Sequence, residues 1–150
     1  MADAAHRRRV LFLCTGNSCR SQMAEGWTRA LWPDRIEPWS AGTRPQPINP
    51  LAVQAMAEAG VDIATQQSKS ADSLAGLPFD AVVTVCDSAR ESCPRWPGAA
   101  RMIHAGFDDP PRLAERCRTP EEALPHYRRV RDEIRQFILT LPQTLEGERT

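Results

Sequence analysis

The chain has 150 residues, of which 41% are hydrophobic and 25% are charged. This length supports one well-buried core and is too short for two ordinary domains. The 19 basic and 19 acidic residues balance, so no global charge indicates binding to nucleic acid or to an anionic membrane.

Three arginines at positions 7–9 precede the short apolar stretch 10–13. A signal peptide begins in a similar way, but this apolar run is far shorter than secretion requires, and Leu13 is too large for a cleavage site. We therefore expect residues 1–8 to be a disordered basic arm of a cytoplasmic protein. Five cysteines in such a chain favour catalytic, redox or metal chemistry over a structural disulfide framework.

Hydrophobic periodicity predicts strands and helices in alternation along the chain. Strands are expected at 10–13, 36–40, 80–85 and 101–104, and helices at 21–31, 50–60 and from 120 to about 141. Asn49 before Pro50 is a natural N-cap, and Thr119 with Glu122 forms a capping box around Pro120. Residues 142–150 are expected to be a polar tail.

This alternation implies right-handed crossovers between parallel strands. The predicted fold class is therefore α/β: one three-layer domain over residues 9–141, with a four-stranded parallel sheet and helices on both faces. Ligands of such sheets bind beyond the carboxyl ends of the strands. Cys14 and Cys86 each directly follow a predicted strand, so the two cysteines are expected at the same edge.

The segment after the first strand has the composition of an oxyanion-binding loop. It runs Cys14, Thr15, Gly16, Asn17, Ser18, Cys19, Arg20 and Ser21. A loop that turns from a strand into a helix directs backbone N–H groups inward, and the helix N-terminus adds partial positive charge.

Within this loop, Arg20 offers a planar fork that matches two oxygens of a tetrahedral anion. The same positive surroundings favour the thiolate form of Cys14, which is the nucleophilic form. Gly16 and Asn17 suit backbone turns with positive φ. The structural alternative is that Cys14 simply ends a buried strand, as free cysteines often do. Cys19 is either an oxidation-prone thiol or a small buried filler.

Cys86 and Cys93 form a second cysteine pair. In one continuous helix the two sulfurs would share a face but lie about 10 Å apart, whereas a disulfide needs Cα atoms within about 7 Å. The pair can therefore close only if the segment unwinds or loops. The alternative is one strand-end cysteine and one incidental surface cysteine.

These motifs together resemble the thioredoxin-coupled arsenate reductases built on the low-molecular-weight tyrosine phosphatase fold. The resemblance rests on residues 14–21, on Ser40-Ala41-Gly42, on the Cys86 and Cys93 pair and on the segment 106–110, and it extends from about Arg9 to Leu141.

The resemblance implies a three-cysteine relay. Cys14 would attack arsenate held by the loop and Arg20, with Asp109 as the general acid. Cys86 would then attack Cys14 and release arsenite, and Cys93 would attack Cys86 to form a disulfide that thioredoxin reduces. Phosphate or sulfate would compete with arsenate for the loop. From the residues alone, Asp109 before a proline is more typical of a turn.

Three other functions compete with this interpretation. A phosphatase acting on phosphate esters would use the same loop and acid without Cys86 or Cys93, but residues 108–112 offer no aromatic side chain for its substrate. A zinc site built from cysteines has unsuitable spacing, and Arg20 would repel the cation. A nonenzymatic thiol switch leaves the oxyanion loop unexplained. We therefore predict neither a cofactor nor a resident metal.

One position departs from the pattern of the family. Many of these reductases resemble one another in a potassium site, formed by equivalents of Asn17, Glu25 and Ser40 with an aspartate that aligns near Lys69. A lysine there reverses the charge. Its ammonium group is a monovalent cation on a flexible stem, and we expect it to reach Glu25 and replace the ion. The alternative is a solvent-facing lysine.

Overall fold

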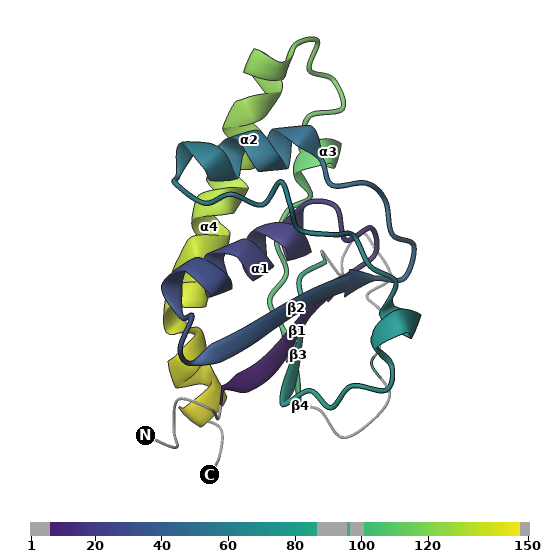
Figure 1. Cartoon of the computed structure of the whole chain (residues 1–150). Helices are drawn as coiled ribbons and strands as arrows, with labels where there is room; N and C mark the ends of the chain where they lie inside the picture. The colour runs from purple at the N-terminus through teal and green to yellow at the C-terminus, as the bar shows by residue number, and fades with distance from the viewer. Residues whose placement is uncertain (1–6, 87–95, 97–100, 148–150) are drawn as a thin grey trace.

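The computed structural model describes residues 7–86, 96 and 101–147. At its centre lies a sheet of four strands: β1 (Arg8–Cys14), β2 (Ile36–Gly42), β3 (Ala81–Thr84) and β4 (Arg101–His104). The strand order is β2-β1-β3-β4, and every neighbouring pair is parallel (Figure 1).

The four predicted strands are all present; β4 has the predicted bounds, and the other three have shifted ends. β2 continues two residues beyond the expected end at Ser40, because its pairing with β1 extends as far as Cys14 opposite Gly42. β1 begins at Arg8, which the sequence had assigned to the N-terminal arm. The hydrogen-bonded neighbour, and not the hydrophobic pattern alone, sets where a strand ends.

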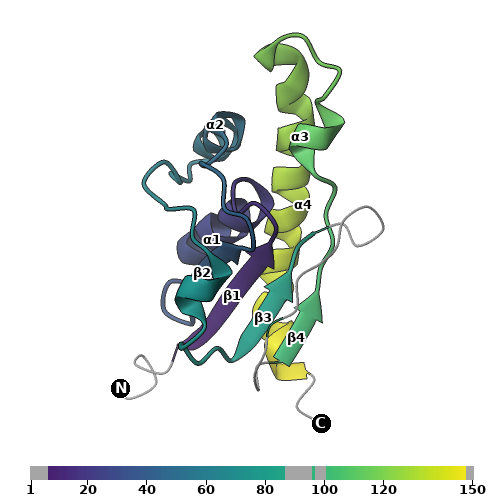
Figure 2. The same ribbon diagram turned by 90° about the vertical axis from the view of Figure 1, so that its right-hand side faces the viewer.

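Helices cover the two faces of the sheet unequally. The helices are α1 (Arg20–Leu31), α2 (Pro50–Glu58), α3 (Pro110–Leu113) and α4 (Pro120–Gly147), together with the short 3₁₀ helix η2 (Ala71–Leu74). Figures 1 and 2 show α1 and α4 packed together on one face, with α2 against α4. The opposite face is covered by η2 and the apolar side chains around it. The predicted α/β fold class is confirmed.

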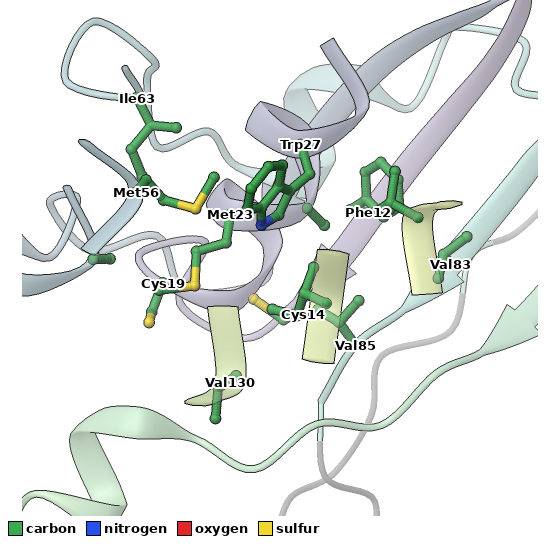
Figure 3. Close-up of a cluster of buried hydrophobic side chains, with 14 of the residues drawn as sticks. Phe12, Cys14, Cys19, Met23, Trp27, Met56, Ile63, Val83, Val85 and Val130 are labelled. Carbon is green, nitrogen blue, oxygen red and sulfur yellow. The ribbon is translucent and has the colours of Figure 1, made fainter. Parts of the chain in front are cut away.

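The alternation of side chains along β1 builds two cores. Phe12 and Cys14 point into the larger core beneath the helices, whereas Leu11 and Leu13 point into the smaller one beneath η2. All four side chains are almost fully buried. Figure 3 shows the larger core, in which Cys14 lies beside Val85 at the carboxyl ends of β1 and β3. A strand buried on both faces is typical of parallel sheets.

The predicted helix starts are confirmed by their caps. Asn49 Oδ1 accepts hydrogen bonds from the backbone of Leu51 at 2.8 Å and of Ala52 at 3.3 Å, which satisfies two donors at the start of α2. At the start of α4, the Thr119 hydroxyl accepts from the backbone N–H of Glu122 at 3.2 Å. Both helices therefore begin where local chemistry satisfies their free N–H groups.

The expected polar tail is wrong for residues 142–147, because α4 continues to Gly147. Pro142 lacks an N–H group, so the carbonyl of Ile138 loses its usual helical donor. The indole N–H of Trp32 donates to that carbonyl at 2.8 Å instead, and Leu145 is buried one turn later. Tertiary contacts thus allow α4 to continue beyond Pro142, although proline ends many helices. In the described ranges, no helix is long and apolar enough to cross a membrane.

Candidate active site

The loop between β1 and α1 forms the floor of a cavity of about 630 Å³ at the carboxyl edge of the sheet. Five of the predicted oxyanion-binding residues line it together with the Cys14 thiol: Thr15, Gly16, Ser18, Cys19 and Arg20. The other two, Asn17 and Ser21, are fully buried behind the loop. A strand that ends in a loop and a helix that starts at it bring these groups together from one short stretch of chain.

Asn17 holds the loop in shape. It has a φ of 50°, the left-handed conformation that asparagine tolerates better than most residues. Its side-chain oxygen accepts from the backbone of Lys69 at 2.7 Å, and its amide donates to the Ser21 hydroxyl at 2.8 Å. The expected positive φ is confirmed at Asn17 but is wrong for Gly16, which is not among the positive-φ residues of the described chain.

The sulfur of Cys14 lies among hydrogen-bonding groups. The backbone N–H of Asn17 donates to it at 3.3 Å, and the Ser21 hydroxyl lies 3.1 Å away. Because that hydroxyl already accepts from the amide of Asn17, its own hydrogen is available to the sulfur. These two contacts fix the position of the Cys14 sulfur at the floor of the cavity.

Arg20 spans the cavity from the first turn of α1 to the segment before α3. It is only 5% exposed, and its guanidinium donates to the carbonyl of Phe107 at 3.0 Å. Its Nη2 lies 3.7 Å from Oδ1 of Asp109, which directly precedes α3 and also lines the cavity. The guanidinium is therefore held in one orientation before any ligand arrives, and a carboxyl group stands beside it.

Cys19 differs sharply from Cys14 although both lie in the loop. Its side chain is 3% exposed, and burial together with the nearby charge of Asp109 raises the pKa of the Cys19 thiol well above its usual range. The neutral thiol is therefore the stable form. Of the two roles that the sequence left open for Cys19, the structure supports the buried filler.

Cys86 follows β3, the strand beside β1. It is fully buried in the same core as Cys14, and it is disulfide-bonded. Val85 continues the pairing register of β3 opposite Cys14, so Cys86 comes one residue after the position that faces Cys14. Cys93, the other cysteine of the predicted pair, lies outside the described residues.

Three cavity-lining residues were not predicted from the sequence: Thr43, Arg44 and Pro111. Thr43 and Arg44 follow β2, the neighbour of β1 on its other side. The rule that led to Cys86, that carboxyl ends of adjacent parallel strands meet at one edge, applies equally to them.

This chain is similar to known proteins in both sequence and fold. Residues 9–150 match the family described as low molecular weight phosphotyrosine protein phosphatase. The chain belongs to this family. It is similar to the arsenate reductase of Halalkalibacterium halodurans, with 45% identity over 139 residues that cover 93% of this chain and 98% of that protein.

Two further relatives support the same placement within the family. The arsenate reductase of Bacillus subtilis strain 168 is 47% identical over 135 residues, covering 90% of this chain and 95% of that protein. A solved structure, described as an arsenate reductase in the phosphate binding state, superimposes with a TM-score of 0.76 at 28% identity, over 92% of this chain and 98% of that one.

The glycine after Ala41 has a steric role in this family member. A Cβ atom on Gly42 would collide with the carbonyl oxygen of Thr15 and lie 2.9 Å from the backbone nitrogen of Asn17. Both contacts are with backbone, so no side chain can move aside. The end of β2 therefore lies against the oxyanion loop only because position 42 has no side chain.

We expect Gly42→Ala to lower the free energy of unfolding by about 2–4 kcal/mol, because overpacking here displaces backbone. The oxyanion loop should distort as well, so phosphate binding should weaken. Urea titration and calorimetric phosphate binding measure the two effects. Gly76→Ala is the matched control, because a Cβ there meets nothing within 4 Å. Equal stabilities of the two variants would contradict the steric argument.

Behind the loop, Lys69 forms the predicted contact with Glu25. The Nζ atom of Lys69 lies 3.8 Å from Oε1 of Glu25, which also accepts from the Ser40 hydroxyl at 2.5 Å. Arg29 donates to the other carboxylate oxygen at 2.5 Å. Lys69 is the only lysine of the chain, and its backbone N–H holds Asn17. The solvent-facing alternative is wrong, because the Lys69 side chain is 21% exposed and paired.

We predict that exchanging sodium for potassium at constant ionic strength leaves activity and melting temperature nearly unchanged, because Lys69 and Arg29 already place positive charge beside Glu25. Lys69→Ala should lower stability by about 1 kcal/mol, or the melting temperature by about 2–4 °C, and should reduce activity. Thermal unfolding and turnover assays in both salts measure this, with Lys69→Arg as the charge-preserving control. Strong activation of the unmodified protein by potassium alone would restore a metal site.

Proposed function

We propose that this chain reduces arsenate to arsenite through a relay of three cysteines that thioredoxin resets. The observation that carries the proposal is the position of Cys86. A phosphatase needs only the loop, Arg20 and an acid, whereas here a second cysteine follows the strand next to Cys14 and is disulfide-bonded. A cysteine engaged in a disulfide supplies no thiolate to a zinc ion, so this observation also favours redox chemistry over a zinc site.

Arsenate is a tetrahedral anion, and the loop is suited to its charge and shape. Backbone N–H groups between Cys14 and Arg20 and the N-terminus of α1 would bind its oxygens, with the guanidinium of Arg20 as a bidentate donor. Because the phosphate ion has the same shape and charge, it should bind and compete. Catalysis would then start from an anion fixed above the sulfur.

The first step joins sulfur to arsenic. The thiolate of Cys14 attacks arsenic, an As–S bond forms, and one oxygen leaves as water after it takes a proton from Asp109. Asp109 stands at the edge of the cavity beside Arg20, where a departing oxygen can reach it. Arsenic is still in its +5 state at this stage.

The second step transfers two electrons. The thiolate of Cys86 attacks the sulfur of Cys14, a disulfide forms, and the electron pair of the As–S bond moves to arsenic, which leaves as arsenite. Cys93 then attacks Cys86, which frees Cys14 and leaves a disulfide between Cys86 and Cys93. The dithiol of thioredoxin would reduce that disulfide in the cytoplasm, where thiols are kept reduced.

The test compares two activities in one sample. Consumption of NADPH in the presence of thioredoxin and its reductase should begin on addition of arsenate, while hydrolysis of p-nitrophenyl phosphate stays at trace level. Omission of thioredoxin should stop the NADPH signal. No arsenate-dependent NADPH consumption would refute the proposal.

A phosphatase acting on phosphate esters is the second candidate. The family match favours it, and so does a cavity of about 630 Å³, which leaves space beside a tetrahedral anion for an organic group. Rapid hydrolysis of p-nitrophenyl phosphate without arsenate reduction would select this function.

A further inference from the structure

A second arginine, Arg44, lines the oxyanion cavity with Arg20. Three backbone hydrogen bonds join residues 43–46 to residues 14–16, among them one of 2.9 Å from the N–H of Arg44 to the carbonyl of Thr15. Pro45 and Pro47, which follow Arg44, further restrict this segment. The backbone from which the Arg44 side chain extends is thus fixed to the loop that would hold the anion.

The charge of an oxyanion favours a second positive side chain at the cavity besides Arg20. The guanidinium of Arg20 lies 3.7 Å from Oδ1 of Asp109 and donates to the carbonyl of Phe107, so part of its hydrogen-bonding capacity is already engaged. A tetrahedral oxyanion such as phosphate carries up to about two negative charges near neutral pH, more than the single charge of Arg20 can balance. The guanidinium of Arg44 supplies a second positive charge at the rim of the cavity.

The Arg44 side chain is accessible to a ligand. It is exposed, and among the described residues no carboxylate forms an ion pair with it. Several other exposed arginines are already engaged, as in the pair between Arg128 and Glu58 and the pair between Arg129 and Asp108. A flexible side chain with an unengaged charge can close on a ligand without breaking an existing contact.

We propose that Arg44 is a second anion-recognition residue, which attracts the oxyanion to the cavity and contacts it from the rim while Arg20 holds it from within. The anion is arsenate if the proposed function is correct, and in this respect the inference rests on that function. The binding chemistry itself requires only a tetrahedral oxyanion, so inorganic phosphate serves as an independent probe.

Calorimetric titration of the full chain with inorganic phosphate tests the proposal. Arg44→Ala should raise the Kd about five- to tenfold, Arg44→Lys should retain most of the affinity, and Arg44→Glu should lose more than alanine. With arsenate, the KM of Arg44→Ala should rise by a similar factor while kcat changes much less. Salt should weaken phosphate binding more steeply in the unmodified protein than in Arg44→Ala.

Arg8→Ala is the matched control, because Arg8 lies at the amino-terminal end of β1 and Cys14 lies at the other end. Its phosphate affinity should equal that of the unmodified protein. Unchanged phosphate affinity in Arg44→Ala would overturn the proposal, and so would equal losses in the alanine and lysine variants, which indicate a structural role. If Arg44→Ala binds phosphate weakly but the unmodified protein does not reduce arsenate, the proposed function fails and the role of Arg44 stands.

Discussion

Cys14→Ser is expected to abolish arsenate reduction and any hydrolysis of phosphate esters, each by at least about a thousandfold. A serine hydroxyl is a much weaker acid and nucleophile than a thiol, so the loop would still bind the anion without attacking it. Assays of NADPH consumption and of p-nitrophenyl phosphate hydrolysis measure the loss. Retained phosphate affinity, measured by calorimetry, would show that the cavity is intact.

Cys117→Ser is the control for this prediction, because Cys117 is a free cysteine that does not line the oxyanion cavity. Its activity should equal that of the unmodified protein. Substantial arsenate reduction by Cys14→Ser would refute the assignment of Cys14 as the nucleophile, whatever the behaviour of the control.

Cys86→Ser should block arsenate turnover and spare slow hydrolysis of phosphate esters, because ester hydrolysis requires attack by Cys14 alone. The predicted difference between the two activities distinguishes a relay residue from a structural one. A general collapse of the fold would reduce both activities together, and that outcome would contradict a separate role for Cys86.

Cys93→Ser should stop after a single turnover when thioredoxin is the electron donor. The stalled protein should contain Cys14 joined to Cys86, which peptide mapping after exposure to arsenate can detect. Both thiols free at that stage would contradict the proposed order of attack.

The loop could be found from the sequence because its parts are neighbours in the chain. A strand, a run of small polar residues, an arginine and a helix fix the direction of the N–H groups locally, so residues 14–21 specify most of the anion site. The capping residues Asn49 and Thr119 were predictable for the same reason, since each acts on the first turn of its own helix.

Pairwise contacts between distant segments were not predictable in this way. Gly42 reads as a loop glycine until the structure brings the end of β2 against the carbonyl of Thr15. No sequence motif singles out Arg44, whereas in the structure three backbone hydrogen bonds fix its segment to the oxyanion loop. The polar composition after Thr140 suggests a tail, but Trp32 replaces the donor that Pro142 lacks, and α4 continues.

By itself, the sequence therefore determined the fold class and pointed to the proposed nucleophile and oxyanion loop, because hydrophobic period, capping and loop composition act over a few residues. Only the tertiary structure decided which distant groups complete the site. The pairing of β1 with β2 brings Arg44 to the edge where Cys14 lies, and the contact of Lys69 with Asn17 supports the loop from behind. Such contacts depend on strand order and packing, which no local pattern encodes.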